Sequence, residues 1–294
     1  MNAKTVGLIG LGLVGTALAR RLLGAGFTVV GYDVDNGKRA QFAQSGGRTV
    51  HSVAAVARAC ERMLVAVFNT DQVEDVVEGA DGVLAVAQSA GPRMVLSVST
   101  CDPDRIAALA SRAALRSVTL LEVPMSGASD QIARGDGVGL VAGERAAFDA
   151  CADILDAVCP GRFFVGAPGN GARTKLAVNL ILGLNRAAMA EGLVFAQQIG
   201  LDPATFLDVA RGSAAYSQIM DIKGGKMVSG EFSAQGKIVQ HLKDVHLMLE
   251  YARRAGQQLP LMTVVEDLLQ GCVAHGEGER DNAAVIEEVR RRRR

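Results

Sequence analysis

The amino-acid sequence predicts an α/β N-terminal domain, built on a doubly wound and mainly parallel sheet, followed by an all-α C-terminal domain. One reason is a glycine-rich segment directly after the first apolar strand. A second is that short apolar runs alternate with helical patterns in the first half, whereas long helical patterns fill the second. A length of 294 residues fits two domains, which we place at residues 1–163 and 164–294 with a long helix joining them.

The first predicted element is a strand that ends in the dinucleotide-binding pattern Gly-x-Gly-x-x-Gly. The strand covers residues 5–9, and a helix is expected to begin near Val14. Gly10 makes the turn, Gly12 lets a pyrophosphate approach the backbone, and Gly15 lets the helix pack closely on the strand. We expect the cofactor to contact Gly10, Leu11, Gly12, Leu13, Val14 and Gly15.

An acidic residue ends the second predicted strand at the spacing of a ribose ligand. Asp33 lies 23 residues after Gly10, where a carboxylate accepts hydrogen bonds from the adenosine ribose hydroxyls. The acid favours NAD over NADP, because it would repel a 2′-phosphate. A helix-capping or turn role for Asp33 is the alternative, and the neighbouring Lys38 and Arg39 leave NADP possible.

Apolar runs spaced along the first half predict the strands of the sheet. The runs are Val6–Ile9, Thr28–Tyr32, Met63–Phe68, Met94–Val98, Thr119–Val123 and Gly139–Ala142. Doubly wound sheets bind ligands beyond the carboxyl ends of their strands. The ends of the third, fourth and fifth strands therefore supply candidate ligand contacts, which are Phe68, Asn69, Ser99, Thr100, Ser126 and Gly127.

A second glycine-rich segment leads into the long helix that we predict for Lys175–Ile199. Three glycines between residues 166 and 171 allow tight turns before Lys175, and Asn179 follows one turn after it. Residues four apart share a helix face, so Lys175 and Asn179 can point into one pocket. Gly200 and Pro203 end this helix, and further helices are predicted over residues 203–211, 236–255, 261–275 and 282–291.

The composition argues against several other classes of function. With 31 acidic and 31 basic residues, the charge calls for no nucleic-acid partner, and Arg290–Arg294 is expected to be a solvated basic helix end. Five scattered cysteines indicate reduced thiols, without a disulfide framework or a zinc site. His241 and His246 do not share a helix face as ligands, so we expect no metal. Because no signal sequence or membrane-length apolar span is evident, we expect no membrane contact and a cytoplasmic location.

Five segments, found in the same order, carry a resemblance to a known family. They are Gly7–Gly15, Pro124–Gly127, Gly169–Asn179, Lys243-Asp244 and Gly276–Ile286. On these segments the chain resembles the β-hydroxyacid dehydrogenase family, which includes 3-hydroxyisobutyrate dehydrogenase and tartronate semialdehyde reductase. The resemblance implies a Rossmann domain, a 6-phosphogluconate dehydrogenase-like helical domain, a nicotinamide cofactor, and assembly into homodimers or homotetramers. It also implies that a small hydroxy acid binds between the domains.

The resemblance implies a catalytic role for one lysine. Lys175 matches the family's catalytic lysine, and Asn179 matches the asparagine that helps to hold the substrate. The lysine would take or return the hydroxyl proton while hydride moves between the carbinol carbon and the nicotinamide. A second cation, for which we suggest Lys243, could lower the pKa of this lysine toward the working range.

The resemblance also implies contacts to the substrate and the cofactor. Ser126 and Gly127 match the loop that grips the substrate carboxylate, while Thr100 and Lys243 match positions near the nicotinamide. Each position has a structural alternative. Ser126 could form a turn, Thr100 could cap a helix, and Lys243 could pair with Asp244 on a helix surface.

Departures from the family pattern leave the preferred substrate open. Ser97 replaces an aspartate, Phe68 replaces a proline, Ala128 adds a methyl group to the substrate loop, and Glu279 and Ala283 alter the C-terminal signature. The function that we predict is oxidation of a small 3-hydroxy acid or reduction of its semialdehyde. The alternatives are an imine or ketone reductase on the same scaffold and a non-catalytic nucleotide-binding relative, and the presence of Lys175 argues against both.

Overall fold

The computed structural model describes residues 4–90 and 93–292. It consists of two compact units, Met1–Lys175 and Leu176–Arg294. The division falls inside the long helix α10, Asn170–Gln198, so the first turns of this helix belong to the first unit and the rest to the second. The predicted domain boundary, between residues 163 and 164, precedes that helix and stays a prediction.

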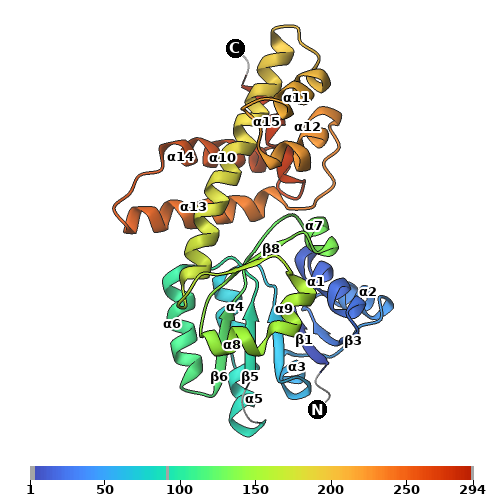
Figure 1. Cartoon of the computed structure of the whole chain (residues 1–294), viewed down its shortest axis with the longest axis vertical. Coiled ribbons are helices and arrows are strands. Elements are labelled where there is room, and N and C mark those ends of the chain that lie inside the picture. The colour runs from blue at the N-terminus through green and yellow to red at the C-terminus, as the bar shows by residue number, and fades with distance from the viewer. Residues whose placement is uncertain (1–3, 91–92, 293–294) are drawn as a thin grey trace. The chain divides into compact units, whose positions relative to one another are not determined.

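The first unit contains the predicted doubly wound sheet, in which all neighbouring strands are parallel (Figure 1). Its strands are β1 Thr5–Ile9, β2 Thr28–Tyr32, β3 Arg48–Thr49, β4 Arg62–Val65, β5 Arg93–Ser97 and β6 Val118–Glu122. Their spatial order is β3-β2-β1-β4-β5-β6. The order reverses between β1 and β4, and a ligand crevice is expected at such a switch point, beyond the carboxyl ends of the strands. The fold class is thereby confirmed.

The strand assignments differ from the prediction at four places, because three short strands were not expected and one expected strand belongs to another sheet. The edge strand β3 was not expected, because two residues that begin with an arginine give no apolar run. The expected strand Gly139–Ala142 does exist as β8, Val138–Val141, but it belongs to a separate small sheet with β7, Met125–Ser126, and β9, Arg162–Phe164. An apolar run reports burial and does not reveal which strand it pairs with.

Helices cover both faces of the main sheet, which explains why its strands are apolar throughout. The helices of this unit are α1 Leu13–Gly24, α2 Asn36–Gln44, α3 Val53–Ala59, α4 Thr70–Glu78, α5 Val83–Ala90, α6 Pro103–Ala114, α7 Ser129–Arg134, α8 Arg145–Ala150 and α9 Ala152–Val158. Leu8 and Leu96 pack with residues of α1 and α9, whereas Ile9 and Val95 pack with residues of α3, α4, α5 and α6. Parallel strands buried on both faces read as continuous hydrophobic runs.

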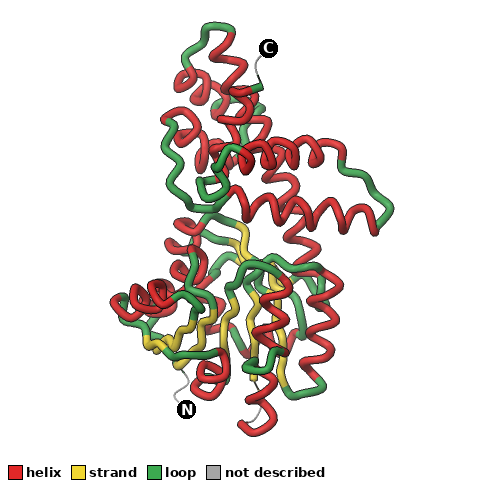
Figure 2. The backbone as a smooth tube through the Cα atoms, turned by 180° about the vertical axis from the view of Figure 1, so that it is seen from behind, coloured by secondary structure: helices red, strands yellow, loops and turns green. Residues whose placement is uncertain are grey.

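The second unit is helical, as predicted (Figure 2). Beyond α10 its elements are α11 Pro203–Arg211, the π-helix η1 Met220–Gly224, α12 Gly225–Ser229, α13 Ile238–Arg254, α14 Pro260–Ala274, the 3-10 helix η2 Asn282–Ala284 and α15 Val285–Arg291. The helix α10 begins at Asn170, five residues before the predicted start, so Gly171 is a helical residue and not a turn glycine. Gly200, with φ +89°, follows its end as expected.

Part of the apolar helix α10 packs in the core of the second unit. Among the described residues it is the one helix that is long and apolar enough to cross a membrane by length and composition, contrary to the expectation that no such span exists. Leu176, Met189 and Leu193 on this helix belong to the hydrophobic core of the second unit. Core packing therefore accounts for these apolar positions, whereas Ile181 and Phe195 on the same helix are exposed.

Candidate functional site

The fingerprint loop between β1 and α1 has the geometry of a phosphate cradle. Gly10 has φ +91°, and a β-carbon there would overlap the carbonyl oxygen of Ala66. A β-carbon on Gly15 would overlap the carbonyl oxygen of Gly10, so only glycine lets α1 pack this closely. At Gly12, by contrast, no described atom lies within 4 Å of the added β-carbon. The loop is thus closely packed at its two ends and open in the middle.

This open position fits the pyrophosphate of a dinucleotide. Gly12 is the N-terminal capping residue of α1, and no described side chain caps the helix there. The first backbone amides of a helix lack intrahelical partners and carry partial positive charge, so they favour an anion. The residues present therefore suit the cofactor that the fingerprint implies.

Asp33 holds the fingerprint loop through its carboxylate. Its carboxylate, 8% exposed, accepts hydrogen bonds from the backbone nitrogens of Leu11, at 2.7 Å, and Asp35, at 2.9 Å. Asp35, and not Asp33, caps helix α2. The ammonium of Lys38 lies 3.8 Å from Asp33 Oδ2, and Arg39 donates to the Asp33 carbonyl oxygen. Both cations that the sequence placed near this acid are therefore beside it.

The loops after β4 and β5 are tied to each other at the same end of the sheet. The hydroxyl of Ser99 accepts a hydrogen bond from the backbone nitrogen of Val67 and donates to its carbonyl oxygen, at 3.0 and 2.7 Å. Asn69 caps α4 by accepting from the backbone nitrogen of Gln72, and Phe68 is 42% exposed. Asp102, rather than the half-buried Thr100, caps α6.

The side-chain oxygen of Asn69 is therefore already engaged in capping α4. Phe68 presents its ring to solvent. Thr100 is not the helix cap that was considered as its structural alternative. Contacts of these three residues with a cofactor stay predictions.

Lys175 is buried in the second turn of α10 and reaches the predicted substrate loop. The residue is 8% exposed, and its ammonium donates a hydrogen bond to the carbonyl oxygen of Met125 at 2.6 Å. Met125 directly precedes Ser126 and Gly127. Gly127 has φ +142°, and the backbone nitrogen of Ala128 donates to Gln131 Oε1 at 2.9 Å. The structure thus places a buried amine beside the loop expected to bind a carboxylate.

A buried carboxylate that the sequence interpretation missed fixes the start of α10. Glu122, the last residue of β6 and 3% exposed, accepts hydrogen bonds from the backbone nitrogens of Gly169 and Ala172, the latter at 2.7 Å. Burial raises the pKa of Glu122 to about 7, although both hydrogen bonds favour its charged form. Glu122 and Met125 therefore hold the first two turns of the helix that carries Lys175.

In the second unit, Asp244 on α13 connects two of the predicted site residues. The amide nitrogen of Asn179 donates to Asp244 Oδ2 at 3.1 Å, and the ammonium of Lys243 lies 2.8 Å from Asp244 Oδ1. Asn179 and Asp244 are 5% and 6% exposed. Lys243 thus forms the ion pair with Asp244 that we considered as an alternative to a cofactor contact. Asp244, however, is buried and does not lie on the helix surface. The suggestion that Lys243 lowers the pKa of Lys175 stays a prediction.

Several features outside the site also bear on the predictions. His241 is buried against Gly183, and exposed His246 lies 3.2 Å from Glu266. Among the described residues no group of three or more His, Cys, Asp or Glu side chains could hold a metal ion. All five cysteines are buried, and no two of them form a disulfide bond.

The basic C-terminal end differs from the expectation of a solvated run. Arg290 pairs with Glu287, Arg291 pairs with Glu277, and Arg292 contacts Asp267 and Glu288. Arg293 and Arg294 lie outside the described residues. The sequence could not reveal these ion pairs, because some acidic partners come from α14 and the loop after it.

Comparison with known proteins supports the same interpretation. The family described as the NAD binding domain of 6-phosphogluconate dehydrogenase matches residues 5–166, and the NAD-binding family of NADP-dependent 3-hydroxyisobutyrate dehydrogenase matches residues 169–289. The L-threonate dehydrogenase of Cupriavidus necator is 30% identical over 97% of this chain and 95% of its own.

Two solved structures have the same fold over nearly the whole chain. A 3-hydroxyisobutyrate dehydrogenase from Salmonella typhimurium has a TM-score of 0.86 at 26% identity, covering 96% of this chain and 99% of its own. Psf3, solved with NADP+ and 2-OPP, has a TM-score of 0.89 at 26% identity, covering 97% and 99%. The fingerprint loop, the buried lysine and these similarities together show that the chain belongs to the β-hydroxyacid dehydrogenase family, with NAD(P) as its cofactor.

Proposed function

We propose that this protein transfers hydride between NAD and a small 3-hydroxy acid or its semialdehyde, with Lys175 as the general acid/base. The observation that carries the proposal is the burial of Lys175 with its ammonium on the Met125 carbonyl, next to Ser126 and Gly127. A buried amine next to an exposed glycine loop suits a hydroxyl or carbonyl oxygen whose charge changes during reaction.

In this mechanism the nicotinamide, when bound, supplies or accepts the hydride. The Ser126 hydroxyl and the backbone of Gly127 bind the substrate carboxylate, and Lys175 holds the proton that the substrate oxygen gains or loses. Asn179, whose amide is oriented by Asp244, contributes a further polar contact to the substrate. General acid–base help of this kind typically contributes about 10²–10⁴-fold in rate.

The choice of NAD over NADP follows from the position of Asp33. A carboxylate at the end of β2 would accept hydrogen bonds from ribose hydroxyls and repel a 2′-phosphate. The adjacent Lys38 and Arg39 could compensate that repulsion, so NADP is the alternative cofactor. Both nucleotides therefore belong in the first assay.

The proposal is tested by following the absorbance of reduced nicotinamide with a panel of 3-hydroxy acids and semialdehydes. L-Threonate is included, because a relative acts on it according to its name. Each substrate is combined with NAD(H) and NADP(H). Lys175→Met is assayed beside the wild type, with the exposed Lys4→Met variant as its control. Turnover of one acid supports the proposal. Silence across the panel despite cofactor binding would contradict it and favour an imine reductase or a non-catalytic role.

We also propose that the protein assembles as a homodimer or homotetramer. Large apolar side chains are exposed on the second unit, among them Ile181, Phe195, Ile199, Val209 and Leu261. Large contiguous apolar patches are typical of protein interfaces. Light scattering coupled to size exclusion should give a mass above that of one chain, 30.7 kDa, whereas a monomer at micromolar concentration would contradict the proposal. A cytoplasmic location stays a prediction.

A further inference from the structure

An arginine is buried inside the helical unit without a counter-charge of its own. Arg186 lies in the middle of α10 and is 4% exposed. No described residue accepts a hydrogen bond from its Nε, and it forms no ion pair with any described carboxylate. Burial lowers the pKa of Arg186 to about 10, so the guanidinium is still charged at neutral pH.

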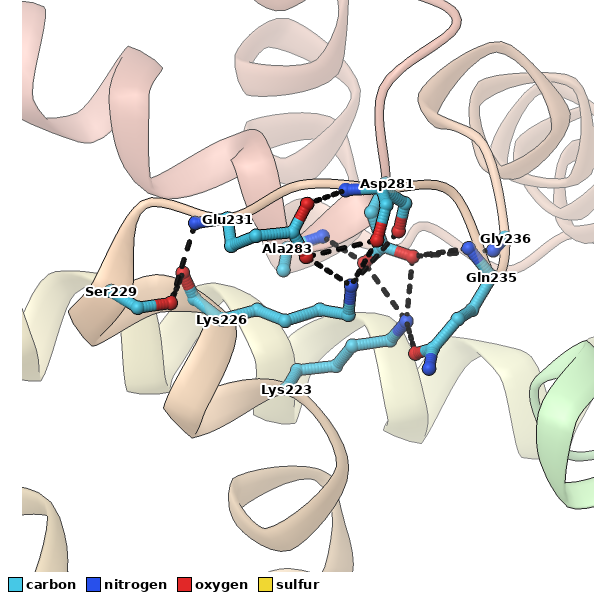
Figure 3. A network of polar contacts seen from close by, with 9 residues as sticks. Lys223, Lys226, Ser229, Glu231, Gln235, Gly236, Asp281 and Ala283 are labelled. Atoms are coloured by element: carbon cyan, nitrogen blue, oxygen red, sulfur yellow. Dashed lines mark hydrogen bonds and ion pairs between the residues drawn. The ribbon is translucent and has the colours of Figure 1, made fainter.

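The carboxylate that acts on Arg186 electrostatically, that of Asp281, is already saturated with hydrogen bonds (Figure 3). The ammonium of Lys223 donates to both of its oxygens, at 2.8 Å each. The backbone nitrogens of Gln235 and Gly236 donate to Oδ2, and that of Ala283 donates to Oδ1. Asp281 therefore neutralises Lys223 and has little capacity left for Arg186.

The charges of this interior region do not balance. Asp281 and Lys223, 0% and 2% exposed, form an ion pair whose charges cancel. The positive charge of Arg186 therefore has no negative counterpart among the described residues of this region. The nearby carboxylate of Glu231 pairs with Lys226, which also donates to the Ser233 carbonyl oxygen, so Glu231 offers no free negative charge (Figure 3). A buried unpaired charge is strongly unfavourable, and proteins normally compensate it with a partner of opposite sign.

We propose that Arg186 binds a small oxyanion, a carboxylate or a phosphate, inside the helical unit. A guanidinium presents parallel N–H donors that match the two oxygens of such a group. Since Nε is enclosed, the residual exposure of Arg186 belongs to its other atoms. The bound anion restores the missing negative charge. This site is distinct from the turnover proposed for Lys175 and does not depend on it.

The test compares the anion dependence of thermal unfolding in the full-length chain and in two arginine variants. Inorganic phosphate and acetate are titrated at constant ionic strength, with chloride as the replaced salt. Arg186→Met removes the charge, and Arg253→Met, on the exposed end of α13, is the matched control. A ligand that binds the folded state raises the melting temperature in proportion to its saturation.

The proposal predicts a saturable rise in melting temperature for the wild type and for Arg253→Met with at least one of the two anions. Arg186→Met should bind the anion at least tenfold more weakly. This is the loss expected when a hydrogen bond to a charged group, which contributes about 1.5–3 kcal/mol, is removed. Phosphate acting alone would identify a phosphate site, and acetate acting alone would identify a carboxylate site.

Two results would overturn the proposal. One is an unchanged anion response in Arg186→Met. The other is the absence of any binding of phosphate or acetate to the wild type in calorimetric titration up to tens of millimolar. The calorimetric measurement needs no variant, so it decides the question even if Arg186→Met fails to fold.

Discussion

The buried carboxylate at the start of α10 should make the stability of the protein depend on pH in an unusual direction. Burial raises the pKa of Glu122 from its ordinary value of 4.5 to about 7, so the folded state binds the proton more tightly than the unfolded state. The stability that this provides is fully present below pH 4.5 and is lost as the pH rises through 7. A difference of this size corresponds to about 3 kcal/mol.

Glu122→Gln isolates the pH dependence, because the amide does not titrate and the one accepting oxygen that it loses is lost equally at every pH. We expect the wild type to lose about 3 kcal/mol of unfolding free energy relative to Glu122→Gln between pH 4.5 and pH 8. Urea unfolding followed by circular dichroism measures the difference, with the exposed Glu61→Gln as control. If the difference in unfolding free energy between the wild type and Glu122→Gln is the same at every pH, the carboxyl group does not titrate in this range and the reasoning is wrong.

Three further predictions concern the cofactor loop, its acid and the interior ion pair. Gly12→Ala should fold with native stability but lose NADH binding in a fluorescence titration, whereas Gly15→Ala, which would overlap the Gly10 carbonyl, should lose roughly 3 kcal/mol of stability. Asp33→Asn should weaken NAD binding and improve NADP binding, and unchanged affinities for both would refute the ribose contact. Asp281→Asn should destabilise the protein by about 3–5 kcal/mol in urea, because Lys223 loses its buried partner; a loss below 1 kcal/mol would contradict this.

The main sheet could be predicted because its strands are buried on both faces and therefore appear in the sequence as apolar runs. Leu8, Leu64 and Leu96 face one core while Ile9 and Val65 face the other, so the runs are apolar without interruption. Partner choice could not be predicted. Val138–Val141 reads like the other strands but pairs with β7 and β9, and only the fold of the intervening chain decides this.

The helical unit could be predicted less exactly at its irregular places. The π-helix η1 at Met220–Gly224 has no periodicity that marks it in the sequence. The early start of α10 depends on Glu122, which lies 47 residues before Gly169 in the chain and supplies the missing acceptors. A contact over that separation leaves no local pattern.

Within the candidate site, the residues that belong to a sequence motif could be predicted. The residues that support them through long-range contacts could not. Lys175, Asn179 and the fingerprint glycines belong to recognisable patterns. Asp244 was seen only as the possible partner of Lys243, although it also orients Asn179. Arg186 was not singled out, because a sequence does not show that a polar side chain lacks a partner.

The most direct test of the central claim is the comparison of turnover and cofactor binding in Lys175→Met and the wild type. Once a substrate is known, kcat is measured from the absorbance of reduced nicotinamide, and NADH affinity from its fluorescence. The account predicts a loss in kcat of about 10²–10⁴-fold with NADH affinity unchanged within twofold. A variant that turns over at a rate close to that of the wild type would show that Lys175 is not the general acid/base.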